Sequence, residues 1–234
     1  MSFLQSAAKV VFRNLATHNP RWLCRLKMLK DHSVEVDQRF WTLYAETLRE
    51  GTVVQSLEDY FNLYQLVLKT QKVPGALAEL GVYRGGSAKL IASLKGDKAL
   101  HLFDTFEGMP TVNPNLDRHK AGDFDDTSLK AVQKYLSRFS NIFYHQGFFP
   151  DSAQDLAKTP TTFSMVHLDV DIYESTKAGL GFFYPRMARG GIIISHDYRR
   201  LTCGGVKQAF DEFFADKPEP VFELWQTQCL VVKQ

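Results

Sequence analysis

The sequence predicts an α/β protein whose sheet is mostly parallel, and two observations indicate this. From residue 76 on, short apolar runs alternate with helical segments, as in β–α–β units whose helices cover both faces of a parallel sheet. The 234 residues, 44% apolar and 23% charged, are typical of a soluble globular domain that folds without disulfides or zinc. We expect a helical extension over residues 1–72 and an α/β domain over residues 73–234.

The expected extension is helical because its apolar positions recur at helical spacing. Residues 3–50 are predicted as helix with a break near Asn19-Pro20, and Leu57–Lys69 is a second apolar helical stretch. Val73-Pro74-Gly75 then ends it with turn-forming residues. We expect this extension to act as a lid over the domain or as the contact of a homodimer.

The α/β domain is expected to contain five parallel strands, at Ala76–Leu80, Ala99–Phe103, Asn141–His145, Phe163–Leu168 and Gly191–Ser195. Helices are expected between them, near Ser87–Leu94, Ser128–Arg138, Ser152–Ala157 and Ser175–Met187. Two short apolar runs in the tail predict an antiparallel hairpin at the sheet edge, at Val221–Trp225 and Cys229–Val232. The polar, acid-rich stretch Thr111–Asp126 predicts a mobile loop or lid.

Cysteine usage and hydropathy exclude several classes of protein. Cys24, Cys203 and Cys229 lie far apart, so they predict neither a disulfide framework nor a cysteine-based zinc site, and a reducing cytoplasm is the expected location. No apolar run approaches the roughly 18 residues of a membrane span. Lys9 and Arg13 interrupt the one candidate signal-peptide segment.

Positive charge gathers at the start of the chain, although the net charge is only +2. Residues 1–30 hold lysines and arginines but no acid, so the remainder is net acidic. A basic amphipathic N-terminal segment could contact an anionic membrane surface, but we favour a helix that packs over the same protein or over a second copy of it. Nucleic acid is not expected, because no dense basic and aromatic stripe continues into the domain.

A glycine-rich turn follows the first predicted strand, and ligands of parallel sheets bind at such strand ends. In Glu79-Leu-Gly-Val-Tyr-Arg-Gly-Gly-Ser87 the glycines let a ligand approach the backbone beside a helix N-terminus. The spacing is not that of dinucleotide-binding turns, and Glu79 would repel a pyrophosphate and attract an ammonium group. The turn therefore favours a cationic ligand carrying an amino acid over NAD; its alternative is a tight turn without a ligand.

The next two strand ends carry an acid and an aromatic residue. Asp104 ends the second strand, where a carboxylate can bind both hydroxyls of a ribose; its alternative role is a helix N-cap. Gly147 and Phe148 follow the third strand. The phenylalanine is equally compatible with stacking on an adenine and with a place in the core.

The last two parallel strands end in acids and a histidine. Asp169 and Asp171 follow the fourth strand, and His196-Asp197 follows the fifth. Neighbouring carboxylates raise one another's pKa unless a cation lies among them, so a divalent metal on Asp169, Asp197 and His196 is expected, with Asp171 free as a general base. The alternative is a set of solvated, helix-capping acids.

The remaining histidines carry weaker predictions. His18, His32, His101 and His119 are expected at the surface or in packing rather than as ligands. His145 is left open.

These segments together resemble the macrocin O-methyltransferase family. The resemblance is carried by the turn from Glu79, by Phe103-Asp-Thr-Phe-Glu-Gly-Met-Pro, by Leu168-Asp-Val-Asp-Ile-Tyr-Glu-Ser-Thr, and by the segments from Arg189 and Gly205. It covers roughly residues 75–233. It implies a Rossmann-like class I fold and an S-adenosylmethionine-dependent O-methyltransferase, usually with magnesium, that methylates sugar hydroxyls of antibiotics.

The resemblance also implies roles for single residues. The methionine part of the cofactor would lie against Glu79, Gly81, Tyr83, Gly85, Gly86 and Ser87. The ribose would lie at Asp104, and the rest of the cofactor near Thr105, Phe106, Gly147, Phe148 and Asp169. Asp171 would be the base, and Asp169, His196 and Asp197 would hold the metal. Many members have Asp-Asp where this chain has His196-Asp197, and imidazole suits Mn, Fe or Zn better than Mg.

Other functions compete with this interpretation. A nicotinamide enzyme on the same fold is disfavoured by the glutamate that opens the glycine turn. A non-catalytic or membrane-associated binding protein that uses the basic N-terminal helix is disfavoured by the intact Asp169, Asp171 and Asp197. The acceptor hydroxyl is left open among a secondary-metabolite glycoside, a polysaccharide sugar, and a phenol or catechol.

Overall fold

The computed structural model describes residues 37–234. The helices predicted between residues 3 and 36, and the basic stretch of residues 1–30, lie outside the described residues. Within residues 37–234, no helix is both long enough and apolar enough to pass through a membrane.

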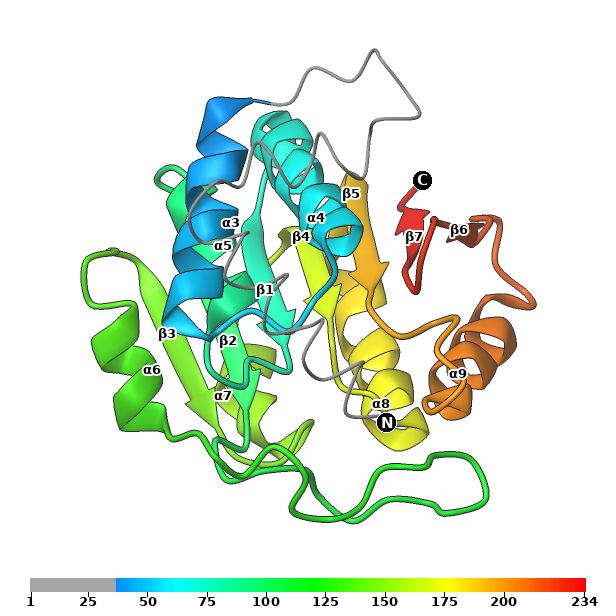
Figure 1. Cartoon of the computed structure of the whole chain (residues 1–234). Coiled ribbons are helices and arrows are strands. Elements are labelled where there is room, and N and C mark those ends of the chain that lie inside the picture. Colours follow the sequence, from blue (N-terminus) through cyan, green and yellow to red (C-terminus); the bar gives the residue numbers. More distant parts are fainter. Residues whose placement is uncertain (1–36) are drawn as a thin grey trace, which may run out of the picture.

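A single seven-stranded sheet forms the centre of the described chain (Figure 1). Its strand order is β3-β2-β1-β4-β5-β7-β6, in which β1 to β5 are parallel, β7 is antiparallel to β5, and β6 is antiparallel to β7 and so runs in the direction of β5. The strands are β1 Ala76–Leu80, β2 Leu100–Asp104, β3 Ile142–Gln146, β4 Phe163–Leu168, β5 Met187–Ser195, β6 Phe222–Glu223 and β7 Cys229–Val232. All predicted strands are therefore present, including the hairpin at the edge.

Helices cover both faces of this sheet. The described α-helices are α3 Gln38–Glu50, α4 Leu57–Lys69, α5 Gly86–Leu94, α6 Leu129–Tyr135, α7 Gln154–Ala157, α8 Tyr173–Phe183 and α9 Gly204–Phe214. Short 3₁₀ turns lie at Thr70–Lys72, Asp151–Ala153 and Tyr184–Arg186.

Two predicted boundaries in the α/β domain differ from the structure by four residues, and one helix was missed. Helix α8 ends at Phe183 rather than Met187, because Pro185 lies in the 3₁₀ turn that follows. Strand β5 consequently begins at Met187, not Gly191. Helix α9 was not predicted: it begins with two glycines and has no side-chain N-cap, so the usual start signals are absent.

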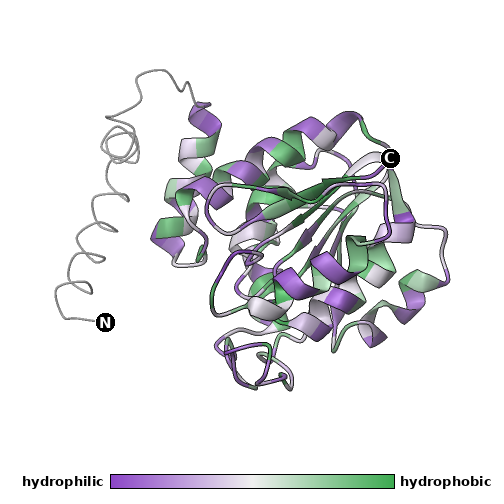
Figure 2. Cartoon of the chain, turned by 90° about the vertical axis from the view of Figure 1, so that its right-hand side faces the viewer, coloured by the Kyte–Doolittle hydropathy of each residue, from purple (hydrophilic) through white to green (hydrophobic). Residues whose placement is uncertain are grey.

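The core consists of two apolar layers, one on each side of the sheet. Along a strand successive side chains point to opposite faces, and Leu77 accordingly packs with helices α3 to α6 whereas Ala78 packs with α7 to α9. Figure 2 shows apolar strands inside and hydrophilic residues on the outer helix surfaces. The described part of the predicted extension, helices α3 and α4, thus belongs to the core, through Phe40 and Tyr60 among others.

Candidate active site

A cavity lies at the carboxyl ends of the parallel strands, where Figure 1 shows the long loop after β2 crossing the sheet edge. It encloses about 1140 Å³ of space, which includes solvent in its open mouth. Most predicted site residues line it: Gly81, Tyr83, Gly86, Ser87, Asp104, Thr105, Gly147, Phe148, Asp169, Asp171, His196 and Asp197. Glu79, Gly85 and Phe106 do not.

The glycine turn holds several segments of chain close together. Gly81 has a φ of +90°, and a Cβ there would lie 1.9 Å from the carbonyl oxygen of Asp169. A Cβ on Gly86 would lie 2.4 Å from the carbonyl oxygen of Thr52. Both glycines are therefore required by packing between β1 and β4 and between α5 and the segment after α3. This requirement comes in addition to any ligand that the turn binds.

Glu79 is fully buried, and its carboxylate faces His167 on the neighbouring strand rather than the cavity. Glu79 Oε1 lies 2.8 Å from His167 Nδ1, and neither side chain is exposed. Burial raises the pKa of Glu79, and the histidine beside it only partly opposes this rise. One oxygen of this acid is thus engaged with an imidazole inside the sheet, and its attraction of an ammonium group stays a prediction.

Asp104 borders the cavity, but its oxygens bind the backbone of two loops. Oδ2 accepts hydrogen bonds from the amides of Val82 and Tyr83, at 2.6 and 2.9 Å. Oδ1 accepts one from the amide of Phe106 at 2.6 Å. The side chain thus fixes the turns after β1 and β2, and its contact with a ribose stays a prediction.

Phe148 and Phe149, which follow the third strand, both border the cavity, but only Phe148 is exposed. Phe148 lines the cavity and is 46% exposed, so its ring is available to stack on a ligand. Phe149 is buried and packs on Phe103 and Phe183. His145, whose role the sequence left open, lies 3.0 Å from His101 in packing between β2 and β3.

An imidazole surrounded by three carboxylates forms the polar centre of the site. His196 Nδ1 lies 2.8 Å from Asp197 and 3.1 Å from Asp169, and Nε2 lies 3.6 Å from Asp59. Burial alone would lower the pKa of His196, but the carboxylates outweigh it and raise this pKa well above the usual value. For Asp169 burial would raise the pKa, but the neighbouring His196 ring outweighs burial and lowers it.

Asp171 lies beside this centre, and its pKa is shifted in the opposite direction from that of Asp169. Burial raises its pKa well above the usual value, and the charges of Asp197 and Asp169 raise it further. A carboxylate with a raised pKa is suited to accept a proton near neutral pH. Asp171 also has a φ of +60°, a left-handed backbone that aspartate tolerates better than most residues.

Three side chains at the candidate site were not predicted from the sequence. Asp59 lies on α4 and is only 2% exposed; an acid within an apolar helix was the available signal. Gln55 precedes the same helix and donates a 2.9 Å hydrogen bond to Asp169 Oδ2. His119, expected at the surface or in packing, places Nε2 3.7 Å from Asp171 Oδ1, and no local pattern distinguishes it from other loop histidines.

The sheet order, with β7 inserted antiparallel between β5 and β6, and the cavity at the parallel strand ends define a Rossmann-like class I methyltransferase fold. The macrocin-O-methyltransferase (TylF) family model matches residues 27–227. The chain belongs to this family, and it is an O-methyltransferase by that membership. The predicted fold class and family are therefore confirmed.

Individual relatives agree with this assignment. The chain is 27% identical to demethyldecarbamoylnovobiocin O-methyltransferase of Streptomyces niveus, over 78% of this chain and 72% of the relative. It is 34% identical to a tetracenomycin 4'-O-methyltransferase of Streptomyces olivaceus that acts on a dimethoxyrhamnosyl compound, over 56% of each. It is 30% identical to mycinamicin III 3''-O-methyltransferase of Micromonospora griseorubida, over 56% of this chain and 58% of the relative.

Solved structures show the same fold. The O-methyltransferase NovP superposes with a TM-score of 0.68 at 25% identity, covering 78% of this chain and 82% of NovP. The calicheamicin methyltransferase CalS11 also gives a TM-score of 0.68, at 19% identity, covering 94% of this chain and 91% of CalS11.

Proposed function

We propose that this protein transfers a methyl group from S-adenosylmethionine to a sugar hydroxyl of a glycosylated small molecule. The observation that carries the proposal is Asp171, a carboxylate of raised pKa on the wall of the strand-end cavity, in a chain of an O-methyltransferase family. The relatives' names support the acceptor class, since they are described as acting on antibiotics, one explicitly on its rhamnosyl group.

The lining of the cavity supports S-adenosylmethionine as its ligand. Its wall contains a glycine turn next to the start of α5, an acid at the end of β2, and a half-exposed phenylalanine after β3. These features suit the amino acid, the ribose and the adenine respectively, and the carboxylates farther along the wall suit a sulfonium cation. When bound, the cofactor supplies an electrophilic methyl carbon.

The chain's own residues then handle the proton. Asp171 accepts it from the acceptor hydroxyl while the oxygen forms its bond to the methyl carbon and the carbon–sulfur bond breaks. Because a sulfonium and a developing alkoxide combine to neutral products, the reaction depends mainly on positioning and on exclusion of water. Thr52 to Gln55 and the loop around Met109 border the cavity and can provide that exclusion.

A divalent metal is the second part of the proposal. Asp169, His196 and Asp197 lie close enough together to share one ion. Their 2.8 and 3.1 Å contacts match neighbouring ligands of an octahedral ion, which lie about 3 Å apart when each bond is about 2.1 Å. A bound ion would lower the pKa of the acceptor hydroxyl. The imidazole favours Mn or Zn over Mg, and His196 must then lose its proton to coordinate.

Calorimetry of cofactor binding tests the proposal. S-adenosylmethionine is titrated into the native chain in EDTA, and then with Mg²⁺ or Mn²⁺. We expect binding by the native chain, loss of binding in Asp104→Ala, and unchanged binding in Asp151→Ala, an exposed acid after β3 that does not line the cavity. Absence of binding to the native chain under all conditions contradicts the methyltransferase proposal.

Methyl transfer to deoxysugar glycosides then tests the acceptor. A panel of demethylated macrolide, aminocoumarin and anthracycline-like glycosides is offered together with their aglycones and with catechol. Transfer to a glycoside but not to its aglycone supports a sugar hydroxyl. Transfer to catechol alone overturns this part of the proposal.

A further inference from the structure

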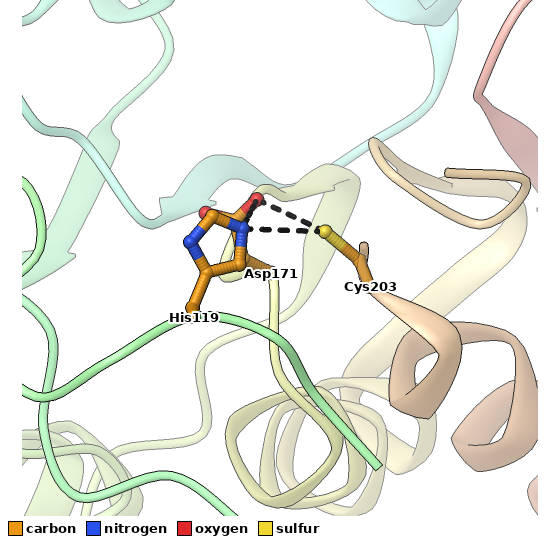
Figure 3. Close-up of side chains that lie close together, drawn as sticks. All are labelled: His119, Asp171 and Cys203. Carbon is orange, nitrogen blue, oxygen red and sulfur yellow. Dashed lines mark hydrogen bonds and ion pairs between the residues drawn. The ribbon is translucent and has the colours of Figure 1, made fainter. Parts of the chain in front are cut away.

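Three side chains from distant parts of the sequence meet beside the cavity (Figure 3). His119 comes from the loop between β2 and α6, Asp171 from the turn between β4 and α8, and Cys203 directly precedes α9. Cys203 Sγ lies 3.6 Å from His119 Nε2 and 3.5 Å from Asp171 Oδ1. His119 Nε2 lies 3.7 Å from the same carboxylate oxygen.

This triangle of atoms has the dimensions of one face of a tetrahedral zinc site. With zinc bonds of about 2.3 Å to sulfur and about 2.0–2.2 Å to nitrogen and oxygen, tetrahedral ligands lie about 3.5–3.7 Å from sulfur and about 3.3–3.5 Å from each other. The sulfur distances agree with these values, and the nitrogen–oxygen distance is only slightly longer. A small shift of either side chain would complete the geometry.

The surroundings of the histidine also match those of a metal ligand. His119 Nδ1, the nitrogen that faces away from the cysteine, lies 3.2 Å from Asp123 Oδ2. Histidines that bind metals usually donate this second nitrogen to a carboxylate, which fixes the ring and makes it more basic. The loop therefore supplies both the candidate ligand and the group that orients it.

The thiol lies among charges that a cation would balance. Cys203 is fully buried. Burial, together with the charges of Asp171 and Asp197, raises the pKa of its thiol. A divalent ion bound beside it would reverse this effect, since coordination deprotonates a thiol.

Backbone contacts hold the three donor segments together. The amide of Arg118 donates to the carbonyl of Thr202 at 3.0 Å, which joins the neighbours of His119 and Cys203. Asp117 Oδ2 accepts a 3.1 Å hydrogen bond from the amide of Tyr173 at the start of α8. A Cβ on Gly205 would lie 2.4 Å from Asp117, so this glycine lets the loop approach α9. The donors are thus positioned before any ion binds.

We propose that His119, Asp171 and Cys203 form a zinc site with three protein ligands and an open fourth position. It adjoins the cluster of Asp169, His196 and Asp197 but shares no ligand with it, and that cluster contains no sulfur. Zinc binding itself does not rest on the proposed function. The consequence of zinc binding does rest on the proposed function. An ion on Asp171 removes the proposed base and holds the loop over the cavity, so zinc at this site inhibits methyl transfer whichever ion occupies the Asp169, His196 and Asp197 cluster.

Cobalt substitution tests the site by a signal that only a thiolate ligand produces. The full chain, carrying Cys24→Ser to remove the thiol outside the described residues, is titrated with Co²⁺ and its absorption is recorded. We expect a sulfur-to-cobalt charge-transfer band that saturates with added Co²⁺ and disappears on addition of Zn²⁺. The cluster around His196 cannot give this band, because a carboxylate and imidazole site lacks sulfur.

Variants assign the band to these residues. Cys203→Ser abolishes it, and His119→Ala weakens cobalt binding at least tenfold. Asp123→Asn weakens binding about 10- to 100-fold, as expected for a group that orients a ligand. Cys229→Ser, which alters the other buried free cysteine of the described chain, keeps the band. Circular dichroism in EDTA confirms that each variant is folded.

Several outcomes overturn the proposal. These are a native chain that binds Co²⁺ without the band, a chain that binds no Co²⁺, and a band that Cys229→Ser removes while Cys203→Ser keeps it. Inhibition is measured separately: Zn²⁺ lowers methyl transfer by the Cys24→Ser chain, and His119→Ala requires at least tenfold more Zn²⁺. Failure of the methyltransferase proposal would leave the absorption result interpretable.

Discussion

At the scale of single residues, four turns near the cavity contain a residue in the left-handed backbone conformation, which most residues other than glycine avoid. Tyr83, Phe106, Asp171 and Asp197 have φ values between 51° and 61°, and they follow β1, β2, β4 and β5. Each such conformation costs of order 1–3 kcal/mol and persists only where the surrounding packing imposes it. These four turns are therefore held in place by the fold, in keeping with a site whose geometry is set before a ligand binds.

Asp171→Asn tests the proposed base. Asparagine tolerates the left-handed backbone at this position and keeps the size of the side chain, but it cannot accept the proton. We expect kcat for methyl transfer to fall about 10²- to 10⁴-fold, while the affinity for S-adenosylmethionine measured by calorimetry changes little. A variant that turns over at the native rate would remove Asp171 from the chemistry.

Gly81→Ala tests the contact between the ends of β1 and β4. Its Cβ would lie 1.9 Å from the Asp169 carbonyl oxygen, on a backbone with φ +90°. Strain and overpacking together predict a loss of about 2–5 kcal/mol in the free energy of unfolding. Gly122→Ala is the matched control, because it has φ +86° but no atom within 4 Å, and it should cost only about 1 kcal/mol. Equal losses in urea unfolding would contradict the packing explanation.

At the scale of secondary-structure elements, helix α4 serves both the core and the site. Tyr60 and Leu63 are fully buried in the layer on that face of the sheet. Asp59, one residue earlier, turns its carboxylate toward His196 and accepts a hydrogen bond from Ser56 at the start of the helix. Displacing α4 would therefore disturb the charge balance around His196 as well as the packing.

The segment that leads to the C-terminal hairpin contains a buried acid, Glu219, whose hydrogen bonds with Tyr184 and Lys233 hold it in place. These contacts predict that stability depends on pH. Although burial raises the pKa of Glu219, hydrogen bonds from Lys233 and Tyr184 outweigh it and lower this pKa from 4.5 to about 2. A depressed folded-state pKa contributes stability above the unfolded value of 4.5, and this contribution is lost as the pH falls toward 2. We expect Glu219→Gln to cost about 1–3 kcal/mol at pH 7.

Urea unfolding between pH 7 and pH 3 measures this effect. The difference between the native chain and Glu219→Gln should shrink steadily below pH 4.5. Asp216→Asn is the control, because Asp216 is an exposed acid of the same segment and should change stability by less than about 0.5 kcal/mol. A difference between native chain and Glu219→Gln that stays constant down to pH 3 would show that the charge of Glu219 is not responsible.

At the scale of the whole molecule, the cavity joins segments from much of the described chain, from Thr52 to Arg200. A ligand that fills it should therefore stabilise the fold as a whole. At one hundred times its Kd, S-adenosylmethionine should add about 2.7 kcal/mol, or roughly 5–10 °C in Tm for a protein of this size. Differential scanning fluorimetry measures the shift. Asp104→Ala should abolish it at the same concentration, and an equal shift with adenosine alone would argue against recognition of the methionine part.

The loop after β2 shows how tertiary contacts modify an expectation from sequence. Its polar composition predicted mobility over Thr111–Asp126, yet Asp117 binds the start of α8 and Arg118 the segment before α9. The loop crosses the carboxyl ends of the strands in Figure 1 and brings His119 to Asp171. Composition indicates that a segment is polar, but it does not indicate whether its polar groups find partners in distant helices.

The sequence by itself determined the alternation of strands and helices, the edge hairpin, and the strand ends that carry Asp104, Asp169, Asp171, His196 and Asp197. These features depend on local periodicity and on the rule that parallel strands end at one sheet edge, so they can be read without coordinates. Only the tertiary structure decided that Glu79 faces His167 inside the sheet, that Asp59 faces His196, and that His119 and Cys203 meet at Asp171. Those contacts join residues up to 137 positions apart along the chain, as for Asp59 and His196, and they depend on register and packing between elements, which no local pattern encodes.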